Sequence, residues 1–385
     1  MPTPTNWSVQ IFQTNTGKIV NNDLPVSDFP QFTRILNGSG SWQVKLLLGD
    51  KSLGFLTDLR QTIAPFRYSI AVCYGQYIAQ AGPIVTTQLD DTNGALTITG
   101  GDFWTLLKYR VIWNSSVPPS QTTAASLLPM DTTRDVNFSS LDLPSIAASL
   151  VTNATARSGF ALPVDVPSTN AGTAVRQYPV YDLATVYTRL TDLVGVSGGP
   201  DVDFSPYFDL ANPGFIRWKM NIGNPLLNAT KLFYFDYGSS CRFISIDSDA
   251  SNMASAVYAK GNATERASQV AYSVNSTLVT AGWPAMEYVD TGHTSATDTT
   301  TIQGYADGDL GLYAKPVEVW HATVNVSAAS SAFGSYDPGS IGVFTIPPNG
   351  HIFIPSGSYS QRILGFTQGD LATVKLTLQA TQGSL

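Results

Sequence analysis

Short stretches in which apolar and polar side chains alternate recur along almost the whole chain. Clear examples are Trp7–Phe12, Trp42–Leu48, Arg67–Cys73, Ala95–Gly100 and Val374–Ala380. Alternation with a period of two places successive side chains on opposite faces of an extended strand. The Gly, Pro, Asn-Gly and Asp-rich segments between these stretches are typical of turns. The pattern therefore predicts a mainly β chain of short strands.

Composition limits the classes of protein that the chain can belong to. A chain of 385 residues is too long for one ordinary core, which predicts two or three domains. Hydrophobic residues make up 43% of it, enough to form a core, while charged residues make up only 13%. The net charge is −7 and no basic run stands out, which argues against sequence-specific nucleic-acid binding. Such a weakly charged surface suits a protein buried in an assembly.

The acidic residues are almost all aspartates. Glutamate occurs only at positions 265, 287 and 318. Glutamate favours helix surfaces, whereas aspartate favours turns and caps. The bias independently predicts few exposed helices.

The first predicted domain spans residues 1–120. Its expected strands are 7–12, 17–20, 42–48, 67–73, 77–89 and 95–100. Within Ile84–Gly100, the segment Asp-Asp-Thr-Asn-Gly separates two alternating arms and predicts a hairpin, because Asn-Gly tolerates positive φ. A short helix capped by Asp102 is expected in Gly100–Trp113, followed by an exposed polar loop at 114–142.

The second predicted domain spans residues 143–245 and mixes helices with strands. Leu143–Gly159 begins with Pro144 and predicts one helix, and Tyr181–Gly199 predicts another with Asp182 as its N-cap. The strands expected around them are 161–166, 202–210 and 214–222. We therefore expect an α+β domain with two helices.

The third predicted domain spans residues 246–385 and returns to strands. These are expected at 317–326, 341–346, 351–354, 359–367 and 372–380, with one short helix near Asp309–Tyr313. The fold class predicted for the chain is mainly β with an α+β insert. Two small β-barrel or sandwich domains would flank the two-helix α+β domain.

Features that would indicate secretion or membrane insertion are weak. Cys73 and Cys241 are far apart in the sequence and are expected to be free thiols. The N-terminus lacks the basic start and apolar segment of a signal peptide, and no apolar run approaches the roughly 20 residues of a membrane span. The Asn-x-Ser/Thr triplets at Asn114, Asn153 and Asn262 are interpreted as chance occurrences.

Sequence motifs for metal binding or nucleophilic catalysis are also weak. The three histidines, His293, His321 and His351, lie on different expected elements without the close spacing of zinc ligands. Gly198–Asp201 and Gly100–Asp102 are interpreted as turns, since neither precedes a helix carrying a phosphate-binding Lys. No catalytic, metal-binding or cofactor-binding residue is predicted, and no cofactor is expected.

Two acidic pairs deserve separate consideration. Glu287 and Asp290 are the best candidates for a glycosidase pair, but a strand would place them on opposite faces. Asp247 and Asp249 alternate like calcium ligands but lack the Gly and distal Glu of an EF-hand, so a turn is expected instead. Trp42, Trp218 and Trp320 fall in alternating strands, which favours core or interface packing over a sugar-binding face.

Several segments, taken in order, resemble a known protein family. They are Phe66–Val85 followed by Leu96–Ile112, the two-helix region 143–222, Ala259–Ser268, Tyr336–Phe344 and Gln361–Asp370. The layout resembles that of the tail-hub proteins (baseplate-hub or minor tail proteins) of long-tailed bacteriophages, especially those infecting actinobacteria. In that family Ala259–Ser268 would match a Gly-x-Gly-x-x-x-Arg segment, but this chain lacks the second Gly.

The resemblance implies a non-enzymatic virion protein of the tail tip, made in the host cytoplasm. It implies a homotrimeric ring that joins the tail tube to the tip and lets DNA pass. Its implied partners are other copies of itself, the distal tail protein ring, the tape measure protein and other tail-tip or fibre proteins. Two alternatives remain: a host-surface carbohydrate-binding adhesin, or an enzyme acting on the cell wall. The enzyme is disfavoured because the last expected strand ends at about Ala380, leaving no room for a hydrolase domain.

Overall fold

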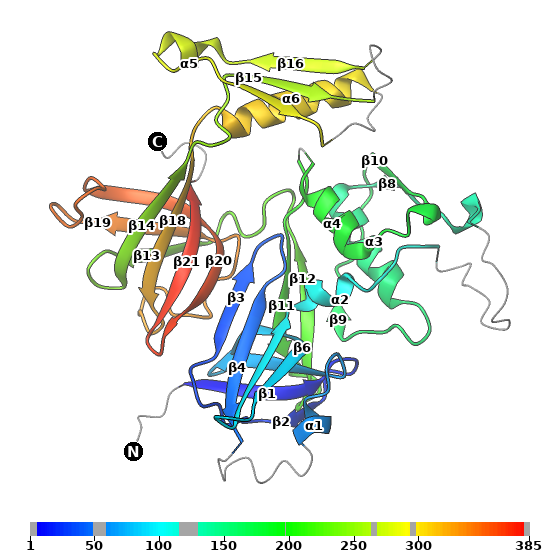
Figure 1. Cartoon of the computed structure of the whole chain (residues 1–385), viewed down its shortest axis with the longest axis vertical. Coiled ribbons are helices and arrows are strands. Elements are labelled where there is room, and N and C mark those ends of the chain that lie inside the picture. Colours follow the sequence, from blue (N-terminus) through cyan, green and yellow to red (C-terminus); the bar gives the residue numbers. More distant parts are fainter. Residues whose placement is uncertain are drawn as a thin grey trace. The chain divides into compact units, whose positions relative to one another are not determined.

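The computed structural model describes residues 6–48, 59–114, 130–196, 198–262, 268–292 and 298–380. The chain is mainly β with few helices, which confirms the predicted fold class (Figure 1). The described strands are β1 (Trp7–Gln13), β2 (Ile19–Asn21), β3 (Gln31–Ile35), β4 (Ser41–Leu47), β5 (Tyr68–Tyr74), β6 (Tyr77–Asp90), β7 (Ala95–Gly101), β8 (Val136–Leu141), β9 (Val164–Asp165), β10 (Ala174–Tyr178), β11 (Val202–Phe208), β12 (Ile216–Ile222), β13 (Leu232–Asp236), β14 (Cys241–Asp249), β15 (Ala256–Lys260), β16 (Val270–Val274), β17 (Glu287–Asp290), β18 (Val317–Asn325), β19 (Ile341–Ile346), β20 (Gly357–Asp370) and β21 (Thr373–Ala380). The described α-helices are α1 (Leu59–Thr62), α2 (Phe103–Leu107), α3 (Leu143–Thr155), α4 (Val186–Val194), α5 (Ser276–Thr280) and α6 (Thr299–Tyr313).

The chain forms two compact units. Unit 1 comprises Met1–Phe243 together with Ala322–Leu385, and unit 2 comprises Ile244–His321. The chain enters unit 2 within β14 and returns to unit 1 within β18. The division into three domains at 1–120, 143–245 and 246–385 stays a prediction, and the barrel or sandwich closure of each β region does too.

One sheet runs through most of unit 1. It has 13 strands among the described residues, in the order β14-β18-β21-β20-β3-β4-β7-β6-β5-β1-β2, with β19 beside β20 and β13 beside β19. Its N-terminal part (β1–β7) and its C-terminal part (β13, β14 and β18–β21) meet where β20 pairs with β3. Strands from opposite ends of the sequence therefore adjoin in one sheet.

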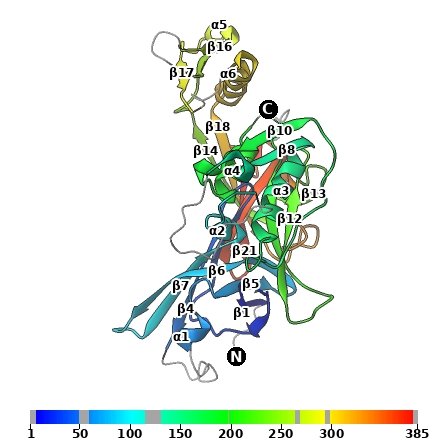
Figure 2. The same ribbon diagram turned by 90° about the vertical axis from the view of Figure 1, so that its right-hand side faces the viewer.

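The α+β segment of unit 1 packs beside this sheet. It contains the sheet β11-β12-β9, the pair β10-β8, and helices α3 and α4, which lie near β12 in both views (Figures 1 and 2). The core beneath it is aromatic: the Trp218 ring lies 5.5 Å from Phe12 and 5.3 Å from Phe103, centroid to centroid. Asp142 caps α3 by accepting a hydrogen bond from the Ser145 amide at 2.8 Å. This packing joins the α+β segment to the first strands.

Unit 2 is a small α+β sandwich. Its sheet has the order β16-β15-β17, and α6 runs along one face (Figure 1). Val257 and Ala259 on β15 pack with Ile302 and Ala306 on α6 to form the core. The alternating pattern of β15 supplies this face, because every second residue points toward the helix.

Several expected strands and turns are confirmed. Strands β1, β4, β5, β6, β7, β18, β19, β20 and β21 coincide with expected segments to within a few residues. The hairpin between β6 and β7 forms as expected, with Gly94 at a φ of +60° in the turn. The left-handed conformation at that position explains the Asn-Gly signature.

Other expectations are wrong at the level of single elements. No strand forms at 351–354, because the His351 Nδ1 atom accepts hydrogen bonds from the amides of Phe353 and Ile354 and closes a turn. The second helix begins at Val186 rather than near Asp182, because Leu183 has a φ of +46° and Thr185 caps the helix instead. Part of the expected loop 114–142 is the strand β8, while residues 115–129 lie outside the described residues.

Two further elements also differ from expectation. Helix α6 begins at Thr299, ten residues before the short helix expected near Asp309–Tyr313, because Asp298 caps it through the Thr301 amide. Asp247 and Asp249 belong to β14 rather than to a turn, although Asp249 does accept a hydrogen bond from the Ser251 amide just beyond it.

Candidate functional site

A buried ion pair connects β3 to β11. The Arg34 and Asp203 side chains are each 3% exposed. Arg34 Nη2 lies 2.6 Å from Asp203 Oδ2, and Arg34 Nε donates to Asp203 Oδ1 at 3.2 Å. The contact is therefore bidentate, the geometry in which arginine binds a carboxylate most strongly.

Arg34 has further polar neighbours besides Asp203, among them Tyr77 and Asp337. Its Nη1 atom donates to the Tyr77 hydroxyl at 3.1 Å, and Asp337 Oδ1 lies 3.5 Å away. Burial alone would lower the pKa of Arg34, but attraction to Asp203, Tyr77 and Asp337 outweighs burial and raises it above its ordinary value. The guanidinium is thus held charged in the interior.

A second ion pair connects the start of β11 to β20. Arg362 Nη2 contacts Asp201 Oδ2, and both side chains are largely buried. Asp201 also accepts hydrogen bonds from Asn37 Nδ2 at 2.8 Å and from the Leu227 amide at 2.7 Å. Because Asp201 and Asp203 are two residues apart, they face the same side of the strand. We call this set the ionic junction: Arg34, Tyr77, Asp201, Asp203, Asp337 and Arg362.

The ionic junction fixes the two parts of the long sheet to the α+β segment. Arg34 and Tyr77 belong to the N-terminal part, Arg362 to the C-terminal part, and Asp203 to β11. All of these residues lie within unit 1. Charged pairs of this kind fix the register of the elements that carry them, since any shift would leave a buried charge unpaired.

Asp102 is a separate buried carboxyl next to α2. It is the N-cap residue of α2, as expected, but its side chain forms no capping hydrogen bond. Its Oδ2 atom accepts a hydrogen bond from the Gly40 amide at 2.6 Å, and Ser39 Oγ lies 3.3 Å from Oδ1. Burial raises the pKa of Asp102 from its ordinary 3.8 to about 7.

This carboxyl predicts a pH-dependent stability. Between pH 4 and 7 the folded protein holds a proton on Asp102 that the unfolded chain releases, so its contribution to stability falls as the pH rises across that window. The expected slope is at most about 1.4 kcal/mol per pH unit for one proton. Urea unfolding of the wild type and of Asp102→Asn at several pH values measures it. The prediction is contradicted if the difference in unfolding free energy between the wild type and Asp102→Asn stays constant from pH 4 to 7.

The candidate residues from the sequence remain scattered. His321 Nε2 lies 3.2 Å from Asp247 Oδ2, His351 closes its own turn, and His293 is outside the described residues. Glu287 is exposed and Asp290 is buried on the opposite face of β17, as expected. In the described ranges, no group of three His, Cys, Asp or Glu is placed to hold a metal ion.

The predictions for cysteine and tryptophan are confirmed. Cys73 and Cys241 are free and buried, and burial raises the pKa of each thiol to about 12. Trp42, Trp218 and Trp320 are all buried. They therefore pack in the core and cannot stack on a sugar.

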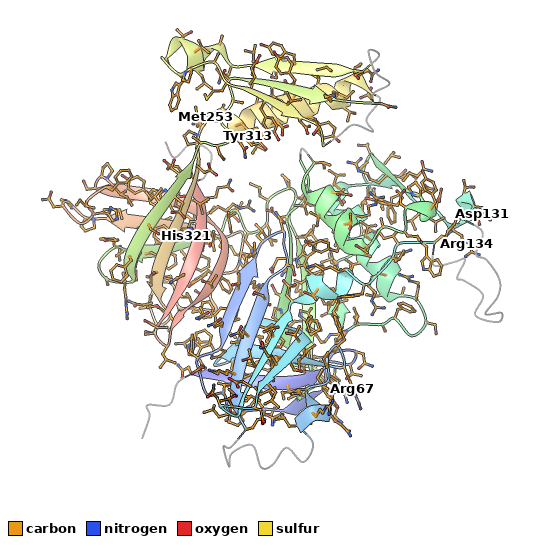
Figure 3. The ribbon with its side chains drawn as sticks, viewed as in Figure 1. Arg67, Asp131, Arg134, Met253, Tyr313 and His321 are labelled. Carbon is orange, nitrogen blue, oxygen red and sulfur yellow. The ribbon has the colours of Figure 1, made fainter. Side chains whose placement is uncertain are left out.

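Hollows in the described part of the chain include a groove in unit 1 and a small cavity in unit 2. A groove of about 300 Å³ on β3, β4 and β7 is lined by side-chain amides and hydroxyls, including Gln31, Gln43, Gln368, Thr33 and Thr99. A cavity of about 20 Å³ in unit 2 lies beside Met253 and Tyr313, which are neighbours in Figure 3. Asp249 is the only acidic residue among its lining residues, and Lys315 also lines it.

The ionic junction was not predicted from the sequence, yet the segments used for the resemblance converge near it. Tyr77 lies in Phe66–Val85, Asp337 in Tyr336–Phe344 and Arg362 in Gln361–Asp370. Asp102, in Leu96–Ile112, lies close enough for the Asp203 charge to contribute to its raised pKa. Ala259–Ser268 belongs to unit 2, and its residues 263–267 lie outside the described residues.

Comparison with known proteins gives a match in structure and none in sequence. No protein-family model matches, and no curated protein matches. The chain is similar to the 43 kDa tail protein of prophage MuSo2 from Shewanella oneidensis, with a TM-score of 0.58, 12% identity, and coverage of 97% of this chain and 98% of the other. It is also similar to a tail protein from Neisseria meningitidis, with a TM-score of 0.54, 13% identity, and coverage of 98% and 97%.

These similarities establish the fold. The resemblance to phage tail proteins is confirmed at that level, over nearly the full length of both solved chains. Neither solved structure comes from an actinobacterial source, so that part of the resemblance stays a prediction. In the portion of the chain that the structure describes, no helix is long and apolar enough to cross a membrane.

The similarity to the two solved tail proteins shows that the chain has the fold of phage tail proteins.

Proposed function

We propose that this chain is a structural, non-catalytic virion protein of a phage tail tip. The observation that carries the proposal is the shared fold, which extends over 97% or more of this chain in two tail proteins. We further propose that it forms a homotrimeric hub ring between the tail tube and the tip. Its partners would be its own copies, the distal tail ring, the tape measure protein and other tip or fibre proteins.

The ionic junction supports a mechanical role. A ring element must keep its interfaces in fixed relative positions, and the junction fixes three segments of unit 1 through buried charges. The low charge content suits surfaces covered by neighbours. A net charge of −7 would also repel DNA passing through such a ring, which favours sliding over binding.

An exposed apolar tip supports contact with a neighbouring subunit. Ile352 is fully exposed and Phe353 is 77% exposed in the connection between β19 and β20. The tip is ordered by its own contacts. His351 Nδ1 accepts hydrogen bonds from two backbone amides, and the His351 ring centroid lies 5.2 Å from that of Tyr237. A pre-ordered apolar tip loses little conformational entropy on docking. We assign it to the contact between copies in the ring.

The experiment is a mass measurement of the purified chain. We expect a species of three copies of the 41.2 kDa chain in native mass spectrometry. The double variant Ile352→Ser/Phe353→Ser should shift the population toward the monomer, because it removes apolar area from the interface. The matched control is Ser356→Ala, a small change in the same connection.

Two outcomes would contradict the proposal. A wild-type chain that stays monomeric at high concentration would contradict the proposed ring. A monomer that binds wall polysaccharide would favour the alternative, a host-surface carbohydrate-binding adhesin.

A further inference from the structure

Two arginines share one aromatic ring in the α+β segment of unit 1. Arg110 follows α2, and Arg157 follows α3. The Cζ atoms of Arg110 and Arg157 lie 4.9 Å and 5.0 Å from the centroid of the Phe160 ring. Arg157 Cζ also lies 5.4 Å from the Trp113 ring centroid. Two guanidinium groups and two aromatic rings thus form one cluster, the arginine pair site.

Backbone hydrogen bonds fix the chain segments that carry these side chains. The Val186 amide donates to the Arg110 carbonyl at 2.7 Å, and the Ile112 amide donates to the Ala184 carbonyl at 2.9 Å. In the turn after α3, the Phe160 amide donates to the Arg157 carbonyl at 2.9 Å, and Gly159 takes a φ of +78°. A residue with a Cβ would be strained there, so glycine allows the turn that brings Phe160 back to Arg157.

Among the described residues, the two positive charges have no carboxylate partner. In the described residues, neither Arg110 nor Arg157 forms an ion pair with an acidic side chain. Burial lowers the pKa of both, and the charge of Arg110 lowers that of Arg157 further. Arg157 Nη2 donates to the Val111 carbonyl at 2.7 Å, while its Nε atom is buried without an acceptor. The chain has a net charge of −7, yet within the described residues neither arginine of this site has an acidic partner.

We propose that the arginine pair site binds a phosphate group. Two guanidinium forks offer several N–H donors and two positive charges, which match the oxygens and charge of a phosphate. A single carboxylate offers two oxygens and one negative charge, so it would leave one arginine unpaired. The Trp113 and Phe160 rings flank the arginines and provide an apolar surface for the carbon skeleton attached to the phosphate.

The test is isothermal titration calorimetry of the full chain at low ionic strength, since salt screens such contacts. The probes are sodium phosphate, glycerol 3-phosphate and a thymidine oligonucleotide, with sodium succinate as the carboxylate comparison. We expect phosphate probes to bind more tightly than succinate. A preference for glycerol 3-phosphate identifies a phosphomonoester ligand, and a preference for the oligonucleotide identifies a phosphodiester.

Variants connect the binding to the site. Arg110→Gln and Arg157→Gln should each weaken phosphate binding by about tenfold or more, the loss expected for a charge-assisted hydrogen bond. The matched control is Arg176→Gln, which removes an arginine whose Nη1 donates to the Val175 carbonyl and should leave binding unchanged. Circular dichroism checks that each variant is folded. If Arg157→Gln fails to fold, Arg157→Lys keeps the charge, removes the fork and should still weaken binding.

Three results would overturn the proposal. One is the absence of heat with every phosphate probe. Another is binding of succinate as tight as that of phosphate. The third is equal loss of binding in Arg157→Gln and Arg176→Gln, which would indicate a general effect of charge rather than a site.

Discussion

Replacing Arg34 with Met is expected to lower the free energy of unfolding of unit 1 by about 3–5 kcal/mol. The substitution leaves the Asp203 carboxylate buried, with its side chain 3% exposed and without its bidentate partner. An unpaired buried charge costs far more than the lost attraction alone. Urea unfolding followed by far-UV circular dichroism measures the loss.

A control variant and a double variant separate this effect from a general loss of charge. Lys45→Met removes an exposed pair with Asp28, 3.5 Å apart, and should change stability by no more than about 1 kcal/mol. The double variant Arg34→Met/Asp203→Leu removes both charges and should recover most of the stability. A loss of less than about 1 kcal/mol in Arg34→Met would show that the ionic junction does not hold unit 1 together.

Replacing Trp218 with Ala is expected to cost a similar amount, about 3–5 kcal/mol. Trp218 is fully buried, contacts Phe12 and Phe103, and donates through Nε1 to the Ala81 carbonyl at 3.3 Å. Its removal leaves a cavity between the first strands and the α+β segment, because close-packed surroundings relax only in part. The same denaturation experiment measures this loss.

The matched control is Trp283→Ala, because Trp283 is 43% exposed. It should change stability by roughly 0.5 kcal/mol or less. Equal losses in the two tryptophan variants would mean that Trp218 is not a core contact between these segments.

The sequence predicted the strands whose inward positions are apolar. In β4, for example, Trp42, Val44 and Leu46 are buried and the residues between them are not. Strand β3 was missed because its inward residues are Phe32 and Arg34, and an arginine in that position breaks the apolar pattern. The sequence predicts a helix shorter than α6, because α6 carries three glycines, Gly304, Gly308 and Gly311, which are poor helix formers.

The ionic junction could not be predicted for a related reason. The sequence around Asp201 and Asp203 predicts a turn followed by a strand, and polar side chains are normally expected to face solvent. Their burial follows from partners that lie far away in the sequence, at Arg362 and Arg34. The arginine pair site is hidden in the same way, because only the fold brings Arg110 and Arg157 to one ring. Local sequence patterns predict local structure. Ion pairs between residues that are distant in the sequence can be predicted only when the topology of the fold is known.

The pairing of β20 with β3 has a consequence for how the chain is made. Thr33 pairs with Thr367, so this edge of β3 has no partner until the chain has been synthesised as far as β20. Exposed strand edges recruit strands from other molecules, and contacts between distant residues form slowly. When many copies are synthesised close together, this exposed edge of β3 would therefore favour pairing between different copies of the chain.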